Sequence, residues 1–271
     1  MFRALVLGAV QGLTEFVPVS SSAHLVLVPF LLGWPIPGLP FDVAVHLGTA
    51  LALLLYFFKE LTGIVLGAFR AVTGRGSERD REMGRVALLL VAASIPAAMA
   101  GVFFSDFFER LYQQPVPVAL QLLVTAALLF GGEAIYRRRP QEDRRGFRGV
   151  SFGDAALIGL LQAAAIIPGI SRSAATITGG MALGLSRDAA ARFSFLLALP
   201  ALLGAGLLEV PDLPPSTDLG TVVAATAVAA VIGFLSIAFL LRYLRTHDTR
   251  PFAYYCVLFS VAVLTYAAFV T

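Results

Sequence analysis

Two short polar segments, 11–24 and 168–176, interrupt apolar stretches and carry most side chains that could do chemistry. A serine hydroxyl becomes a nucleophile when a nearby carboxylate or imidazole accepts its proton. A guanidinium group binds phosphate through a planar fork of two hydrogen bonds. The segments hold these groups together: Gln11, Glu15, Ser20, Ser21, Ser22 and His24 in the first, and Ser171, Arg172, Ser173 and Thr176 in the second.

Each segment has the pattern of a broken helix. Pro18 and Pro168 mark the breaks, and Ser20 and Ser171 follow as candidate N-caps of the next half-helix. A helix start presents unpaired N–H groups and the positive end of its dipole. Two such starts aimed at one point make an anion site, to which Arg172 adds its charge.

Simpler interpretations stay open for the same residues. A serine at a half-helix start can be only a cap, and Arg172 can be a structural partner of Glu15. Gln11 and Gln162 have the pattern of hydrogen-bonding groups between helices. Asp42 and His46, at the start of an apolar run, are expected at the membrane interface rather than in catalysis, although the site could open there. Glu133, near a span end, is expected to snorkel towards water.

The composition places these segments in a membrane. Of 271 residues, 58% are hydrophobic and 14% are charged, and the mean hydropathy is +0.83. A soluble domain has about 25% charged residues. This excludes an ordinary soluble enzyme, and the arginine-rich loops between apolar runs indicate membrane topology rather than nucleic-acid binding. The apolar runs fall at 4–16, 22–33, 41–58, 86–106, 115–136, 152–167, 173–184, 188–208, 219–241 and 252–270.

The lengths of these runs predict the topology. A crossing needs about 20 apolar residues, so the short pairs 4–33 and 152–184 are expected to be re-entrant hairpins. Six crossings remain. They put the arginine-rich loops 59–85, 137–150 and 242–251 on one side, which the positive-inside rule makes cytoplasmic. The loops 107–114 and 209–218, and both termini, then face outward.

The two hairpins are related by an internal repeat. A shift of 151 residues aligns Ala4, Gly8, Gln11, Ser20, Ser22 and Ala23 with Ala155, Gly159, Gln162, Ser171, Ser173 and Ala174. Three crossings separate the copies, so the second hairpin enters from the opposite face, as in the inverted repeats of transporters. We predict an all-α polytopic membrane protein with one membrane domain, 1–271. It divides into repeat one, 1–136, a cytoplasmic linker, 137–151, and repeat two, 152–271.

At these residues the chain closely resembles the undecaprenyl-diphosphate phosphatase family of the bacitracin-resistance type. One family signature is Glu/Gln-x-x-x-Glu leading into Pro-Val-Ser-Ser-small-His, here 11–24; the other is Pro-Gly-x-Ser-Arg-Ser-x-x-Thr, here 168–176. Some members carry Glu where this chain has Gln11, which leaves Glu15 as the carboxylate of the motif. The resemblance extends over essentially the whole chain.

The resemblance implies hydrolysis of undecaprenyl diphosphate to the monophosphate, the lipid carrier for cell-wall synthesis, and inorganic phosphate. It implies a bacterial inner-membrane protein with its site on the outer side, and a divalent cation, Mg²⁺ or Ca²⁺, which the sequence itself does not show. The expected partners are the polyprenyl diphosphate and membrane lipids, without nucleic acid. The oligomeric state stays open between a monomer and a homodimer.

The working mechanism assigns roles to the two motifs. Ser21 is the nucleophile or a ligand of the terminal phosphate, Glu15 or His24 accepts its proton, and Arg172 holds the phosphoryl oxygens. In a variant of this mechanism, Glu15 binds a Mg²⁺ ion that directs a water. The competing class is a transporter or flippase of undecaprenyl phosphate, which needs an anion site but no nucleophile and base. Gln11, Ser20, Ser22, Ser171, Ser173 and Thr176 are expected to complete the phosphate pocket.

Overall fold

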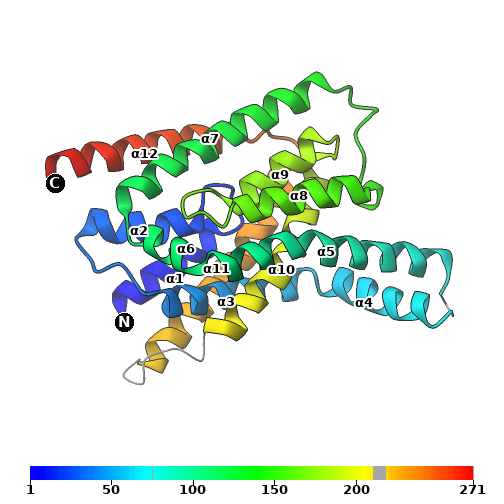
Figure 1. Ribbon diagram of the computed structural model, residues 1–271, viewed down its shortest axis with the longest axis horizontal. Helices are drawn as coiled ribbons and strands as arrows, with labels where there is room; N and C mark the ends of the chain where they lie inside the picture. The colour runs from blue at the N-terminus through cyan, green and yellow to red at the C-terminus, as the bar shows by residue number, and fades with distance from the viewer. Residues whose placement is uncertain (75, 210–217, 271) are drawn as a thin grey trace.

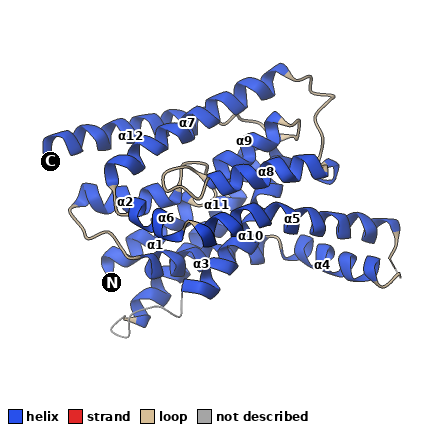
Figure 2. Cartoon of the chain, viewed as in Figure 1, coloured by secondary structure: helices blue, strands red, loops and turns tan. Residues whose placement is uncertain are grey.

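The computed structural model describes residues 1–74, 76–209 and 218–270, and all regular structure in them is helical (Figures 1 and 2). The all-α prediction is therefore confirmed. The helices are α1 (Phe2–Thr14), α2 (Ser21–Leu32), α3 (Leu39–Tyr56), α4 (Phe58–Val72), α5 (Glu78–Phe103), α6 (Ser105–Tyr112), α7 (Pro115–Arg138), α8 (Phe152–Ala164), α9 (Arg172–Ala182), α10 (Arg187–Glu209), α11 (Leu219–Leu244) and α12 (Arg250–Val270), with a short 3₁₀ turn at Phe147–Gly149.

Five helices, α5, α7, α10, α11 and α12, are long and apolar enough to cross a membrane. Helices α3 and α4 form a sixth candidate span that bends by 76° between Tyr56 and Phe58. These six candidates correspond to the six expected crossings. The short apolar helices α1, α2 and α8 match the pieces expected in the two hairpins.

The expectation of polar loops at 59–85 and 107–114 is wrong. Helix α4 and the first turns of α5 occupy the former, and α6 occupies most of the latter. Helix α4 is largely apolar and buries Ile64 and Gly67, while Lys59, Glu60 and Arg70 lie on its outer face, so these scattered charges concealed a helix. A capping box between Ser77 and Asp80 then starts α5. The expected loop 209–218 lies mostly outside the described residues.

Both termini lie at one end of the bundle (Figure 1). The opposite end holds the C-terminal end of α4, the start of α5 and the connection from α7 to α8 (Figure 1). This agrees with an even number of crossings and with arginine-rich connections on one side. The assignment of that side to the cytoplasm stays a prediction.

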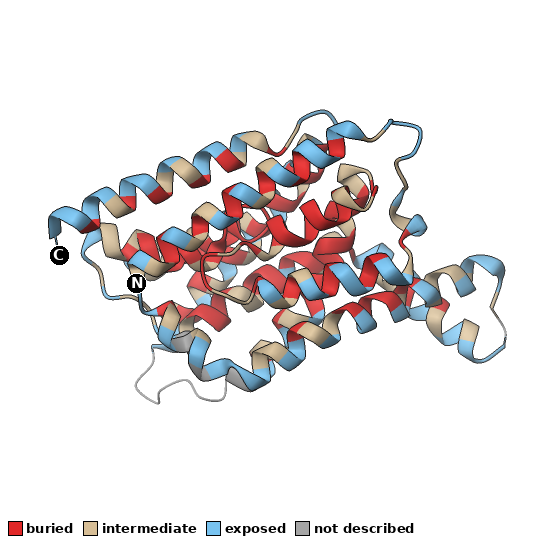
Figure 3. Ribbon diagram, turned by 45° about the horizontal axis from the view of Figure 1, so that its top comes forward, coloured by how far each residue is buried: buried red, intermediate tan, exposed pale blue. Residues whose placement is uncertain are grey.

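The bundle is packed inside and apolar outside. Buried residues gather on the inner faces of the helices, and exposed residues lie on the outer faces (Figure 3). Large apolar side chains such as Leu88 and Val91 on α5 and Leu235 on α11 are exposed. An apolar outer surface of this extent suits a lipid solvent, because water would penalise it.

The two short hairpins pack in matching ways. Helix α1 lies against α11, and its repeat counterpart α8 lies against α5. Gly8 of α1 meets the backbone of Ala225, and the equivalent Gly159 of α8 meets the backbone of Ala93. A Cβ atom at either glycine would collide with a backbone carbonyl, so both positions require glycine. These contacts support the predicted inverted repeat, whose exact division of the chain stays a prediction.

Candidate functional site

The first hairpin turns at Ser20, which has φ +70°, the only positive φ of a non-glycine residue in the described part of the chain. Its hydroxyl accepts a hydrogen bond from the N–H of Ala23 at 3.3 Å and so caps α2, as predicted. The same hydroxyl shares a hydrogen bond with Ser22 at 3.1 Å. The strained backbone places the start of α2 at the inner end of the hairpin.

The second hairpin repeats this arrangement. Ser171 caps α9 by accepting from the N–H of Ala174 at 3.1 Å, and it shares a hydrogen bond with Ser173 at 3.1 Å. The two tips touch, because the N–H of Gly169 donates to the Ser22 hydroxyl at 3.3 Å. Two half-helix starts therefore meet inside the bundle, as the sequence predicted.

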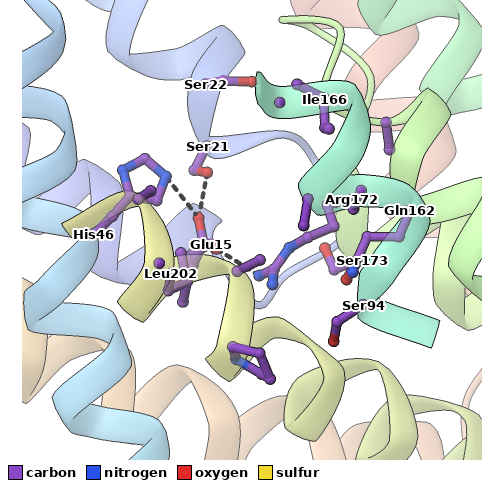
Figure 4. A pocket seen from close by; sticks show the side chains of 18 of the residues that line it. Glu15, Ser21, Ser22, His46, Ser94, Gln162, Ile166, Arg172, Ser173 and Leu202 are labelled. Carbon is purple, nitrogen blue, oxygen red and sulfur yellow. Dashed lines mark hydrogen bonds and ion pairs between the residues drawn. The ribbon is translucent and has the colours of Figure 1, made fainter. Parts of the chain in front are cut away.

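Glu15 is the centre of the polar cluster between the tips (Figure 4). The Ser21 hydroxyl donates to its Oε2 at 2.5 Å, and Nη2 of Arg172 lies 2.6 Å from its Oε1. Gln11 donates to Oε2 at 3.0 Å from the preceding turn of α1. The structure thus brings together three of the four predicted catalytic residues: a hydroxyl, a carboxylate that can take its proton, and a guanidinium.

His46 also belongs to this cluster, which the sequence analysis missed by expecting it at the interface. Its Nε2 lies 3.3 Å from Oε2 of Glu15 (Figure 4), and its Nδ1 lies 2.8 Å from the carbonyl oxygen of Asp42. A carbonyl only accepts, so Nδ1 carries a hydrogen. Oε2 of Glu15 already accepts from Ser21 and Gln11, so we assign a second hydrogen to Nε2. The spacing of Asp42 and His46, one turn apart at the start of α3, was the available signal.

His24 lies apart from the cluster, although the sequence analysis expected it beside Ser21 and Glu15. Its Nδ1 donates to the carbonyl of Ser20 at 2.7 Å, and its Nε2 lies 2.7 Å from the hydroxyl of Tyr255 on α12. The ring is stacked on Tyr255 and Phe259. Side chains three positions apart on an α-helix point in directions that differ by about 60°. That difference turns His24 towards α12 and leaves no ring nitrogen for the proton of Ser21.

Thr176 does not line the phosphate pocket and Gln162 does not bridge two helices, contrary to what was expected of each. Thr176 is buried against Ser194, with 2.6 Å between the hydroxyl oxygens, and does not line the cavity described below. Gln162 faces that cavity and makes no hydrogen bond between helices. Gln11 does bridge helices, since its amide also lies 3.5 Å from the hydroxyl of Thr49 on α3.

Glu133 does not snorkel, contrary to expectation. It is fully buried and forms ion pairs with Arg137 and Arg187. The N–H of Thr249 also donates to it, at 3.4 Å. The carboxylate thus joins α7, α10 and the connection before α12, because its partners bring the opposite charge inward instead of drawing Glu133 out to water.

A cavity of about 480 Å³ lies beside the cluster, within the range of small-molecule sites. Ser20, Ser21, Ser22, Ser171, Arg172 and Ser173 line its polar side, with Glu15, His46 and Gln162. Small residues of α5 and α10, both candidate membrane spans, line its apolar side, among them Ala98 and Pro200, which are exposed. The cavity therefore has one wall made of two helices that are apolar enough to span a membrane.

The donor set does not fit a resident divalent cation. Among the residues that the structure describes, Glu15 is the only carboxylate that lines the cavity, and both of its oxygens already contact hydrogen-bond donors or cationic groups. Within the described residues, no cluster of three or more His, Cys, Asp or Glu side chains could hold a metal ion. Mg²⁺ and Ca²⁺ need several oxygen ligands, so ligands other than these side chains would have to complete such a site.

The fold and the site define a class: a polytopic membrane protein with a serine, a carboxylate and an arginine at the meeting point of two half-helix starts. The chain belongs to the family described as "Bacitracin resistance protein BacA", whose model matches residues 4–262.

Curated relatives match over nearly their full length. One is an undecaprenyl-diphosphatase of Pelotomaculum thermopropionicum, 42% identical over 268 residues, which are 99% of this chain and 97% of the relative. Another, from Alcanivorax borkumensis, is 45% identical over 270 residues, 98% of this chain and 99% of the relative. A third, from Moorella thermoacetica, is 41% identical over 264 residues, 97% of each chain. The relatives from Alcanivorax borkumensis and Moorella thermoacetica also carry the name undecaprenyl-diphosphatase.

Proposed function

We propose that the protein hydrolyses undecaprenyl diphosphate to undecaprenyl phosphate and inorganic phosphate. The observation that carries this is the 2.5 Å hydrogen bond from Ser21 to Glu15 beside Arg172, in a cavity with one wall made of two candidate membrane spans. The shared activity in the names of full-length relatives supports the same reaction. A carrier of lipid phosphate needs the arginine but not a hydroxyl paired with a base, so the geometry favours the enzyme over the flippase.

The cavity has the two kinds of lining that a lipid diphosphate needs. Arg172 and the serine-capped starts of α2 and α9 offer donors to the phosphates. Nη1 of Arg172 is buried and has no hydrogen-bond partner among the described residues, so one half of the guanidinium is available to a ligand. The apolar tail leaves between α5 and α10, where small side chains line the opening.

The chemical step follows from the positions of Ser21 and Glu15. Oγ of Ser21 attacks the terminal phosphorus, and its proton passes to Glu15. The bond between phosphorus and the bridging oxygen breaks, and the prenyl phosphate leaves with the electron pair. Glu15 gives this proton to the leaving prenyl phosphate and is a carboxylate again. Water then attacks the phosphorus of the phosphoserine and gives a proton to Glu15, which passes it to Oγ of Ser21 as the bond between that oxygen and phosphorus breaks and inorganic phosphate is released. Arg172 and the N–H groups at the helix starts stabilise the charge that develops on the phosphoryl oxygens.

His46 regulates how strongly Glu15 acts as a base. Its Nε2–H and Arg172 both attract the carboxylate while the cavity holds no phosphate. An arriving phosphate competes with Glu15 for Arg172, which leaves Glu15 a stronger base beside the bound substrate. His46 keeps a proton next to the reacting groups and holds Glu15 in place through the exchange.

The divalent cation expected from the family resemblance plays no part in this scheme, because the side chains do not form a site for it. A site on the outer side of a bacterial inner membrane remains part of the proposal, since it depends on the predicted orientation. The proposed partners are the lipid substrate and the surrounding lipids.

The test is phosphate release from undecaprenyl diphosphate by purified protein in detergent. Wild type is compared with Glu15→Ala and Arg172→Ala, and with the matched controls Glu142→Ala and Arg138→Ala, whose side chains are exposed and outside the cavity. We expect release by wild type and both controls, and near-complete loss in the two cavity variants. No release by folded wild type would contradict the proposal and favour the flippase, which a liposome translocation assay would then test.

A further inference from the structure

Gln162 carries a buried amide that finds no hydrogen-bond partner in the described part of the chain. Its side chain is on α8, the residue is 1% exposed, and it lines the cavity. Neither Oε1 nor Nε2 has a hydrogen-bond partner among the described residues. Leaving a buried amide without hydrogen-bond partners is unfavourable, so such a group inside a cavity points to a ligand.

The internal repeat explains why this amide is free. Gln162 is the counterpart of Gln11, whose amide donates to Glu15 one turn later. A shift of 151 residues puts Ile166 at the position of Glu15. The second repeat therefore keeps the glutamine but replaces its carboxylate partner with an apolar side chain. Gln162 and Ile166 both face the cavity (Figure 4).

The surroundings of Gln162 match the chemistry of a phosphate. Arg172 and Ser173 lie on the same side of the cavity, with the guanidinium between Gln162 and Glu15 (Figure 4). Nη1 of Arg172 is the other buried donor of this region without a partner. An amide NH₂, a guanidinium N–H and a hydroxyl together can donate to several phosphate oxygens.

The position of the opening distinguishes the two phosphates of a diphosphate. Ser94 of α5 lies near Gln162, whereas Ser21 and His46 lie on the other side of Arg172 (Figure 4). Helix α5 lines the apolar side of the cavity, where the proposed opening for the tail lies. A phosphate attached to a tail that leaves through this opening is therefore closer to Gln162, and the terminal phosphate is closer to Ser21.

We propose that Gln162, with Nη1 of Arg172 and the hydroxyl of Ser173, forms a subsite for the lipid-attached phosphate. This rests on the proposed function, because it divides the diphosphate between two subsites. The terminal phosphate binds at Ser21 and leaves as inorganic phosphate. The prenyl phosphate product stays at Gln162 until it returns to the bilayer.

The two products give a test of the two subsites. Inhibition constants are measured for a short prenyl monophosphonate and for inorganic phosphate, with wild type and Gln162→Leu. We expect the constant for the phosphonate to rise about ten- to hundred-fold, the loss expected for one hydrogen bond to a charged group. The constant for inorganic phosphate should stay within about two-fold by the same argument, because its subsite is intact.

Stability measurements separate this role from a structural one. Gln162→Leu removes an unsatisfied amide, so the unfolding temperature should stay the same or rise while phosphonate binding weakens. Gln162→Glu places a negative charge beside the phosphate and should weaken phosphonate binding at least as strongly. Gln141→Leu changes an exposed glutamine outside the cavity and should alter neither inhibitor.

Three results would overturn the subsite. Unchanged constants for both inhibitors would mean that Gln162 contacts only water, and an equal rise for both would mean that it shapes the whole cavity. A rise in the inhibition constant for inorganic phosphate alone would mean that the terminal phosphate, not the lipid-attached one, binds at Gln162. Failure of wild type to release phosphate would instead contradict the proposed function, and direct binding of the phosphonate to wild type and Gln162→Leu would still test the subsite.

Discussion

Glu15 and Arg172 are 157 positions apart in the chain, and their side chains meet at 2.6 Å inside the bundle. Glu15 follows the last turn of α1, and Arg172 begins α9. They meet because both hairpins end in the interior, where the N–H of Gly169 also contacts Ser22. Neither half of the chain contains the site alone.

Replacing Ser21 tests the nucleophile. Ser21→Ala removes the hydroxyl bonded to Glu15 and should lower kcat about a thousand-fold or more, as loss of a nucleophile does in other hydrolases. Substrate binding should persist, because Arg172 and the helix starts are unchanged. Steady-state phosphate release together with binding of a prenyl phosphonate measures both effects. Survival of most activity would show that water, rather than Ser21, attacks phosphorus.

His46 makes the reaction sensitive to alkaline pH. The form with a hydrogen on Nε2 attracts Glu15, so activity should fall as rising pH removes that hydrogen. His46→Gln keeps a neutral donor towards Glu15 and should retain part of the activity without this alkaline decline. The measurement is kcat/KM against pH for both proteins. An identical alkaline limb in His46→Gln would assign the decline to another group.

His24 positions Ser20 instead of accepting the proton of Ser21. His24→Phe keeps the stacking on Phe259 but loses the bonds to Ser20 and Tyr255. We expect about a ten-fold fall in kcat, the size of one or two lost hydrogen bonds, with an unchanged pH profile. Tyr255→Phe should add little to His24→Phe, since the two act through one contact. If kcat of His24→Phe fell as far as that of Ser21→Ala and the pH profile changed, His24 would be a catalytic residue after all.

The donor set predicts weak metal binding by the protein alone. Metal analysis of protein purified with Mg²⁺ or Ca²⁺ and then desalted should find far less than one ion per chain. If activity needs a divalent cation, its apparent affinity should depend on the diphosphate concentration, because the substrate oxygens would supply most ligands. Stoichiometric metal that is lost in Glu15→Ala would contradict this and support the water-directing variant.

Glu133 should contribute to stability rather than to chemistry. Glu133→Ala leaves Arg187 without its buried partner, and breaking such a pair costs about 3–5 kcal/mol, whereas Arg137 keeps its ion pair with Asp248. Thermal unfolding in detergent should show a large decrease, whereas Glu142→Ala at an exposed loop position should show almost none. KM of the Glu133 variant, measured at a temperature where it stays folded, should be unchanged.

The sequence predicted the features that depend on local chemistry. Apolar run length indicated the spans and hairpins, and the serines after Pro18 and Pro168 are the caps that the pattern indicated. The pairing of Glu15 with Arg172, foreseen as one alternative, follows from two charges being placed in apolar surroundings. These predictions succeeded because neighbouring residues or burial alone determine the outcome.

The rest depends on how helices are turned against each other. The direction of His24 is decided by Phe259 and Tyr255, which lie more than two hundred positions away. The place of His46 in the site follows from the packing of α3 beside α1. The free amide of Gln162 becomes visible only when Ile166 is compared with Glu15 across the repeat.

The opening of the cavity between α5 and α10 makes the substrate concentration in the membrane, rather than in solution, the one that sets the rate of this protein. Ala98 and Pro200 line it on two candidate membrane spans, so we expect the substrate to arrive sideways within the membrane. Turnover should then follow the mole fraction of substrate in the bilayer, not its amount per volume of solution. Diluting the membrane with inert lipid should slow the enzyme even when the total quantity of substrate in the tube is unchanged.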